Sequence, residues 1–198
     1  EVLPIPPTVP PTESIIGVVG DATMGLSDYA MPLSSGERWR PVGGELSVVE
    51  AGITPRDLPD RWMGLEQVEL LVWAGPADPA ELGPERAGAV REWVARGGHL
   101  VVVLPPVGQR WTDAQRNLLH DMLPAVTIRR RTGMDLNPFL PLMTSVGGIT
   151  LTTNATVHEL IPLPDSREGA ARRVLSGPDG TCVVAQRDYG LGAVTLVG

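Results

Sequence analysis

The sequence contains no lysine, one cysteine and few aromatic residues. All sixteen basic residues are arginines, which excludes Schiff-base chemistry and the phosphate-binding lysine of P-loop proteins. The single cysteine, Cys182, excludes an intramolecular disulfide and a cysteine-built zinc site within one chain. Five Trp, two Tyr and one Phe are all the aromatic side chains in 198 residues.

Charge and hydropathy argue against nucleic-acid binding and against membrane-spanning segments in this chain. The net charge of −7 makes nucleic acid an improbable partner, because an acidic chain repels phosphate backbones. The longest apolar runs, such as residues 100–104, are far shorter than the roughly 20 residues that span a bilayer. The hydrophobic fraction of 42% is enough for a core, and the length fits one domain. We expect no cofactor, because neither a P-loop nor a Gly-x-Gly-x-x-Gly motif follows a strand.

The beginning of the chain is rich in proline. Residues 1–12 carry five prolines, a composition that favours polyproline II and disfavours helices and strand ladders. We therefore predict a linker over residues 1–13 and a domain over residues 14–198. The chain begins without Met and ends within a predicted strand, so we expect it to be part of a longer protein whose membrane segments lie elsewhere.

One strand–helix–strand unit stands out. Residues 68–73 (VELLVW) are apolar on both faces, which is typical of a buried parallel strand. Residues 84–96 have the spacing of an amphipathic helix, and Gly97-Gly98 predicts a left-handed cap at its end. Residues 99–104 form the next strand, so the unit is a βαβ crossover. A second helix is predicted over residues 112–122. Further predicted strands cover residues 14–20, 46–50, 125–129, 157–163, 173–175, 182–186 and 193–197, the last ones as a β-meander.

Several of these segments together resemble a known superfamily. The helix end Trp93-Val94-Ala-Arg-Gly97-Gly98, the strand after it, and the closing Tyr189-Gly190-Leu-Gly192-Ala-Val194 are similar to class I glutamine amidotransferase-like domains. The similarity is greatest to the non-catalytic branches in bacterial membrane and envelope proteins. The resemblance implies an α/β fold: a flavodoxin-like three-layer sandwich with a mainly parallel sheet and a C-terminal β-hairpin. Ligands of such folds bind at the carboxyl ends of the strands.

The chain departs from the catalytic members of that superfamily. Those members place a nucleophilic Cys or Ser at a sharp strand-to-helix elbow, where this chain has Pro105-Pro106. Their His and Glu share one face of a strand, whereas His158 and Glu159 are adjacent and must point to opposite faces. Cys182 sits in an apolar strand pattern and is expected in the core. We therefore expect no enzyme activity of this type.

A candidate ligand site follows the first and third predicted strands. Asp21, Thr23 and Gly25 come directly after residues 14–20, and Asp78 follows residues 68–73. Carboxylate and hydroxyl groups at this edge of a parallel sheet could hold a polar ligand or ligate a metal. The alternative is that these aspartates cap turns and a helix start. The sequence leaves both interpretations open.

Other polar groups favour structural roles. His99 and His120 lack the i, i+4 pairing of a zinc helix, and Ser34-Ser35-Gly36 lacks the Gly-x-Ser-x-Gly pattern of a nucleophile.

Arginines and tryptophans could also serve binding. Arg129, Arg130 and Arg131 form a basic run that fits a solvated strand edge, or else a site for an anion or an acidic partner. Trp39, Trp62 and Trp111 are expected to be buried over the sheet, with an interface as the alternative.

These observations predict a non-catalytic ligand- or protein-binding module of a larger, membrane-anchored bacterial protein. Its expected location is the extracytoplasmic side of the cell membrane, and its expected partner is a protein or small molecule of the envelope. One alternative is a metal-assisted hydrolase with a site around Asp21, Thr23 and Asp78, for which metal-dependent stabilisation would be evidence. Another is a structural domain of an envelope assembly, for which a dimer that buries Trp39 or Trp111 would be evidence.

Overall fold

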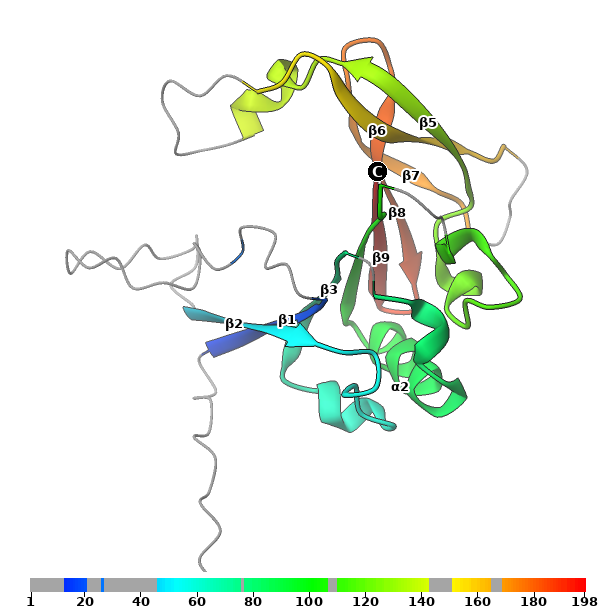
Figure 1. The fold of residues 1–198 in the computed structure, drawn as a ribbon. Helices are drawn as coiled ribbons and strands as arrows, with labels where there is room; N and C mark the ends of the chain where they lie inside the picture. Colours follow the sequence, from blue (N-terminus) through cyan, green and yellow to red (C-terminus); the bar gives the residue numbers. More distant parts are fainter. Residues whose placement is uncertain are drawn as a thin grey trace, which may run out of the picture.

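A seven-stranded sheet in the order β2-β1-β3-β4-β9-β8-β7 forms the centre of the molecule (Figure 1). The structure is a computed structural model that describes residues 13–20, 26, 46–75, 77–106, 110–142, 151–164 and 169–198. The strands are β1 (Glu13–Val19), β2 (Leu46–Ile53), β3 (Val68–Trp73), β4 (His99–Val103), β7 (Arg172–Ser176), β8 (Cys182–Tyr189) and β9 (Gly192–Val197). The first five in the sheet order are parallel, and β8 and β7 are antiparallel to their neighbours. The predicted flavodoxin-like α/β fold is therefore confirmed.

The βαβ unit formed by β3, helix α2 (Pro84–Ala95) and β4 is the one that the sequence predicts. Pro84 begins the helix at a position where a missing N–H costs nothing. Gly97 has a φ of 122° and donates its N–H to Val94 O at 3.0 Å, and Gly98 donates to Trp93 O at 3.1 Å. This pair of hydrogen bonds is a Schellman cap, which confirms the predicted helix end.

The main core lies between α2 and one face of the sheet. Trp73 and Trp111 are buried there and meet edge to face, with their ring centroids 5.2 Å apart. Trp62 is half-buried against the same cluster and carries the Arg96 guanidinium 4.1 Å above its ring. Burial is thus confirmed for Trp111 and in part for Trp62, whereas Trp39 lies outside the described residues.

A smaller cluster covers the opposite face of the sheet. Val18, Val72 and Ala74 are its buried members, and Leu26 packs against them. Of the connection from β1 to β2, the structure describes Gly20 and Leu26.

The β5–β6 ribbon is a separate two-stranded antiparallel sheet made of β5 (Val126–Met134) and β6 (Ala155–Pro162). Figure 1 shows it beyond the end of the sheet at which β9 finishes. The sequence predicts β6 as part of the C-terminal meander, which is wrong in this respect: β6 pairs with β5, and the meander consists of β7, β8 and β9.

The predicted helix over residues 112–122 is replaced by turns and 3-10 helices. The Asn117 side chain donates to Trp111 O at 2.9 Å and accepts from Leu119 N at 3.0 Å. Asp113 Oδ1 accepts from Gln115 N at 3.0 Å. These side chains compete with helical backbone hydrogen bonds, which explains why the helical spacing is misleading here. The described 3-10 helices are η1 (Trp62–Leu65), η2 (Pro79–Glu81), η3 (Arg110–Thr112), η4 (His120–Met122) and η5 (Asn137–Leu142).

The linker at the start of the chain and the membrane anchoring of the parent protein both stay predictions. Residues 1–12 lie outside the described part, so the linker over residues 1–13 is untested, and β1 already begins at Glu13. Within the described ranges, no helix has the length and apolar character needed to cross a membrane.

Candidate functional site

The predicted ligand site begins where β1, β2 and β3 end together. Gly20 donates its N–H to Ile53 O at 2.9 Å, and Ala74 donates to Val19 O at 2.8 Å. A Cβ on Gly20 would lie 2.1 Å from Ala74 O, and its φ is 119°, so this crowded edge requires glycine. Asp21, Thr23 and Gly25 follow directly and lie outside the described residues. Their role as ligand-binding residues stays a prediction.

Asp78, the fourth predicted site residue, caps the start of η2. Its Oδ1 accepts from Ala80 N at 3.1 Å, and its Oδ2 forms an ion pair with Arg110 Nη1. Both carboxylate oxygens are thus engaged within the chain. The geometry agrees with the capping alternative that the sequence leaves open.

The three histidines lie in three different settings. His99 Nε2 is 2.8 Å from Thr195 Oγ1, between β4 and β9, and burial lowers the pKa of His99. His158 is buried in the ribbon, and His120 lines a pocket at the surface. Among the described residues, no three or more His, Cys, Asp or Glu side chains are grouped to hold a metal ion. Cys182 is 1% exposed, which confirms it as a core residue.

The ribbon closes the carboxyl end of β4. His158 Nε2 is 3.0 Å from Pro105 O, and a Cβ on Gly198, just after β9, would lie 1.9 Å from His158 O. Because a carbonyl oxygen only accepts hydrogen bonds, Nε2 must carry the proton of this pair. Glu159 points away from His158 and accepts from Arg129 at 2.6 Å, so the predicted opposite orientation is confirmed.

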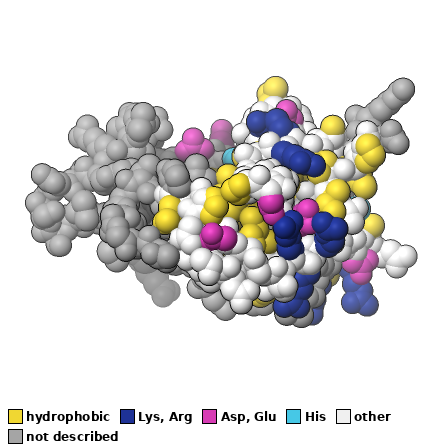
Figure 2. Space-filling model, turned by 90° about the horizontal axis from the view of Figure 1, so that it is seen from above, with side chains coloured by type: hydrophobic (Ala, Val, Ile, Leu, Met, Phe, Trp, Pro, Cys, Tyr) yellow, Lys and Arg dark blue, Asp and Glu magenta, His cyan; other side chains and the backbone are white. Residues whose placement is uncertain are grey.

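The basic run on β5 is mostly neutralised within the chain. Arg129 pairs with Glu159, and Arg131 pairs with Asp179 at 2.5 Å in the turn between β7 and β8. The backbone N–H of Thr181 and, to a smaller extent, its side chain donate hydrogen bonds to Asp179. These bonds lower the pKa of Asp179 and so favour its charged form. Figure 2, which views the molecule from above, shows arginine side chains beside acidic ones. Arg129 and Arg131 therefore hold the ribbon together and attach it to the main sheet.

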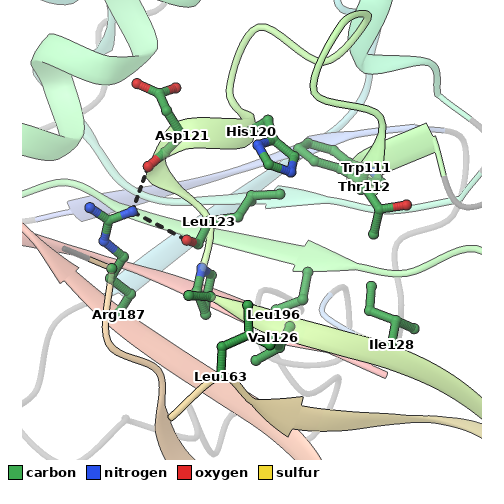
Figure 3. A pocket seen from close by; sticks show the side chains of 13 residues that line it. Trp111, Thr112, His120, Asp121, Leu123, Val126, Ile128, Leu163, Arg187 and Leu196 are labelled. Carbon is green, nitrogen blue, oxygen red and sulfur yellow. Dashed lines mark hydrogen bonds between the residues drawn. The ribbon is translucent and has the colours of Figure 1, made fainter. Parts of the chain in front are cut away.

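A pocket of about 250 Å³ lies beside β9, between the segment that follows β4 and the first half of β5 (Figure 3). Trp111 and Leu196 line it and belong to the core cluster that α2 covers. Its apolar wall also includes Leu123, Val126 and Ile128, and Leu163 stands at its edge with 47% of its surface exposed. The pocket thus combines apolar side chains with four polar ones, Thr112, His120, Asp121 and Arg187.

Arg187 supplies a positive charge to the pocket. Its Nη1 donates to Asp121 O at 2.5 Å and to Leu123 O at 3.3 Å, as drawn in Figure 3. Its guanidinium carbon lies 5.6 Å from the centre of the Tyr189 ring. None of the described carboxylates forms an ion pair with Arg187. The nearby Asp121 carboxylate is instead bound by Arg91 at 2.6 Å.

Sequence reasoning missed this pocket. Its polar side chains come from residues 112–121 (Thr112, His120 and Asp121) and from Arg187 on β8, and no short motif joins the two segments. Arg187 lies two residues before the Tyr189-Gly190 turn near the end of the chain. The sequence indicates this segment only as a structural feature.

Comparisons with known proteins show the fold. No protein-family model and no curated protein matches the sequence. Two solved structures, cytoplasmic proteins STM3548 and STM1381 from Salmonella typhimurium, are similar with a TM-score of 0.55 at 11% and 10% identity, each covering 93% of this chain and 86% of its own. A ThuA-like protein from Bacteroides uniformis is similar with a TM-score of 0.50 at 10% identity, over 99% of this chain and 85% of its own. At these identities the likeness extends to the fold alone, a flavodoxin-like α/β sandwich shared with these three proteins.

Proposed function

We propose that this chain is a non-catalytic binding module. The observation that carries the proposal is the carboxyl end of β4, where the resemblance to amidotransferase-like domains would place a nucleophile. Pro105 stands there instead, and its carbonyl accepts a hydrogen bond from the His158 ring. His158 is 7% exposed and comes from the β5–β6 ribbon, which packs over this edge.

The chemistry of His158 supports the proposal. A general base must reach the proton that it removes, directly or through one water. His158 is buried, and its Nε2 already donates to a backbone carbonyl. The described carboxylate at the neighbouring strand end, Asp78, is paired with Arg110. These groups stabilise the fold at the edge where related folds carry out reactions.

An activity screen tests the proposal. The purified chain is assayed with glutamine and with short p-nitrophenyl esters, with and without Mg²⁺, Mn²⁺ or Zn²⁺. We expect no turnover above that of a His158→Gln variant or of an Arg173→Gln control on the exposed strand β7. Turnover that disappears in His158→Gln or Asp78→Asn, but not in the control, would contradict a non-catalytic function.

We also propose that the module belongs to a membrane-anchored bacterial protein and faces the extracytoplasmic side. The proline-rich residues 1–12 support this as a tether. The test is protease accessibility of the full-length protein, tagged on this domain, in spheroplasts. Cleavage from outside, with the tag in the membrane fraction, is expected. Full protection with a soluble tag would contradict the location.

A further inference from the structure

We propose that the pocket beside β9 binds a small organic monocarboxylate with an apolar body. The inference rests on the proposed binding function and names its ligand class. It combines three features of the pocket: an arginine that forms an ion pair with none of the described carboxylates, an apolar wall and a limited volume.

The carboxylate would bind Arg187. A guanidinium has five N–H donors, and the two bonds to Asp121 O and Leu123 O use only Nη1. Nε and Nη2 donate to no group within the described part of the chain, so two neighbouring donors are available for a bidentate carboxylate pair. Gly169 lines the pocket beside this guanidinium, and a Cβ there would lie 3.0 Å from Nη1. A larger side chain at this position would therefore crowd the guanidinium.

The apolar wall defines the rest of the ligand. Leu123, Val126, Ile128 and Leu196 would contact a hydrocarbon body, with Leu163 at the mouth. A volume of about 250 Å³ holds about eight groups of the size of a water molecule, at roughly 30 Å³ each. A linear or branched acid of about six carbons therefore matches this space.

The charge of the pocket favours a single negative charge. Arg187 is its one cation among the described residues, and the Asp121 carboxylate on the same wall is already compensated by Arg91. A dianion such as inorganic phosphate would bring a second charge without a second cation, and it would leave the apolar wall unused. A monocarboxylate satisfies both features.

Calorimetry with hexanoate and its analogues tests the inference. We expect hexanoate to bind, hexanamide to bind at least about tenfold more weakly because it lacks the charge, and butyrate to lose about fourfold for each methylene removed. Inorganic phosphate should not compete. Equal affinity for hexanoate and hexanamide, or no binding of hexanoate, would overturn the inference.

Two variants locate the site. Arg187→Gln should weaken hexanoate binding at least about tenfold. Because Arg187 also anchors Asp121 and Leu123, Leu163→Asp is the second variant: it leaves Arg187 in place and puts a negative charge at the mouth. Val174→Asp is the matched control, since Val174 is 50% exposed on β7 and does not line the pocket.

The outcomes separate this inference from the proposed function. Binding that is lost in Leu163→Asp and kept in Val174→Asp supports the pocket as the site. Unchanged affinity in Leu163→Asp overturns it, whatever the activity screen shows. Turnover in that screen would instead contradict the non-catalytic function while leaving a carboxylate site in place.

Discussion

Replacing Gly192 by alanine should destabilise the fold strongly. The turn between β8 and β9 packs against the end of α2: Leu191 N donates to Ala95 O at 2.9 Å, and Ala193 N donates to Gly98 O at 3.2 Å. A Cβ on Gly192 would lie 2.2 Å from the carbonyl oxygens of both Gly98 and Val94. Both obstacles are backbone atoms, so no side-chain rotation can relieve the contact.

The magnitude follows from these contacts. Bringing the Cβ to an ordinary separation requires a shift of about 1 Å or more between the turn and the helix end. Such a shift breaks the two hydrogen bonds, at about 1 kcal/mol each, and adds an overpacking cost of about 1–3 kcal/mol. The sum is about 3–5 kcal/mol, a large part of the roughly 5–15 kcal/mol that stabilises a typical domain. For a chain of this size it corresponds to a fall in Tm of about 6–20 °C.

Urea and thermal unfolding measure the effect, with Gly88→Ala as the control. Gly88 is an exposed position within α2, and a Cβ there would have no neighbour within 4 Å. The same substitution at Gly88 should stabilise the chain by about 0.5–1 kcal/mol, because alanine favours a helix. A Gly192→Ala variant within about 0.5 kcal/mol of the parent chain would refute the packing argument.

Three further predictions concern buried or half-buried side chains. Burial lowers the pKa of His99 below 6.5. The unfolded chain therefore binds a proton at His99 more tightly than the folded chain does. The stability that depends on neutral His99 is present above pH 6.5 and is lost as the pH falls below it. Urea midpoints from about pH 7.5 to about pH 5 should fall less in His99→Gln than in the parent chain. Cys182 should react with a thiol reagent only after urea is added, and reaction at the native rate of an exposed thiol would contradict its burial. Trp111→Leu should lower the free energy of unfolding by at least about 2 kcal/mol in urea titrations, because it removes the ring that packs on Trp73, and a loss below about 0.5 kcal/mol would contradict that packing.

Local signals predict the centre of the fold well. The apolar run of β3, the spacing of Ala87, Val90 and Val94 in α2, and Gly97 at its end are all short-range features that the structure confirms. The buried positions of Cys182 and Trp111 also follow from local patterns.

Long-range pairing and side-chain competition explain what the sequence does not predict. β5 and β6 pair across the intervening η5 segment, and a strand pattern alone does not identify its partner. The helical spacing of residues 112–122 fails because the Asn117 amide binds the backbone on both sides. The pocket requires Arg187 to approach Asp121, a contact over 66 positions that no spacing rule indicates.

NMR chemical-shift mapping of the ¹⁵N-labelled chain, titrated with hexanoate, would show where this module binds its ligand. We expect the backbone signals of Leu123, Ile128, Leu163 and Arg187 to move together and to saturate with one affinity, while those of Gly75 and Asp78 stay in place. Shifts that cluster instead at Gly75 and Asp78, at the carboxyl edge of β3, would contradict the pocket as the binding site. Such shifts would support the carboxyl edge of the sheet, near Gly75 and Asp78, as the functional site.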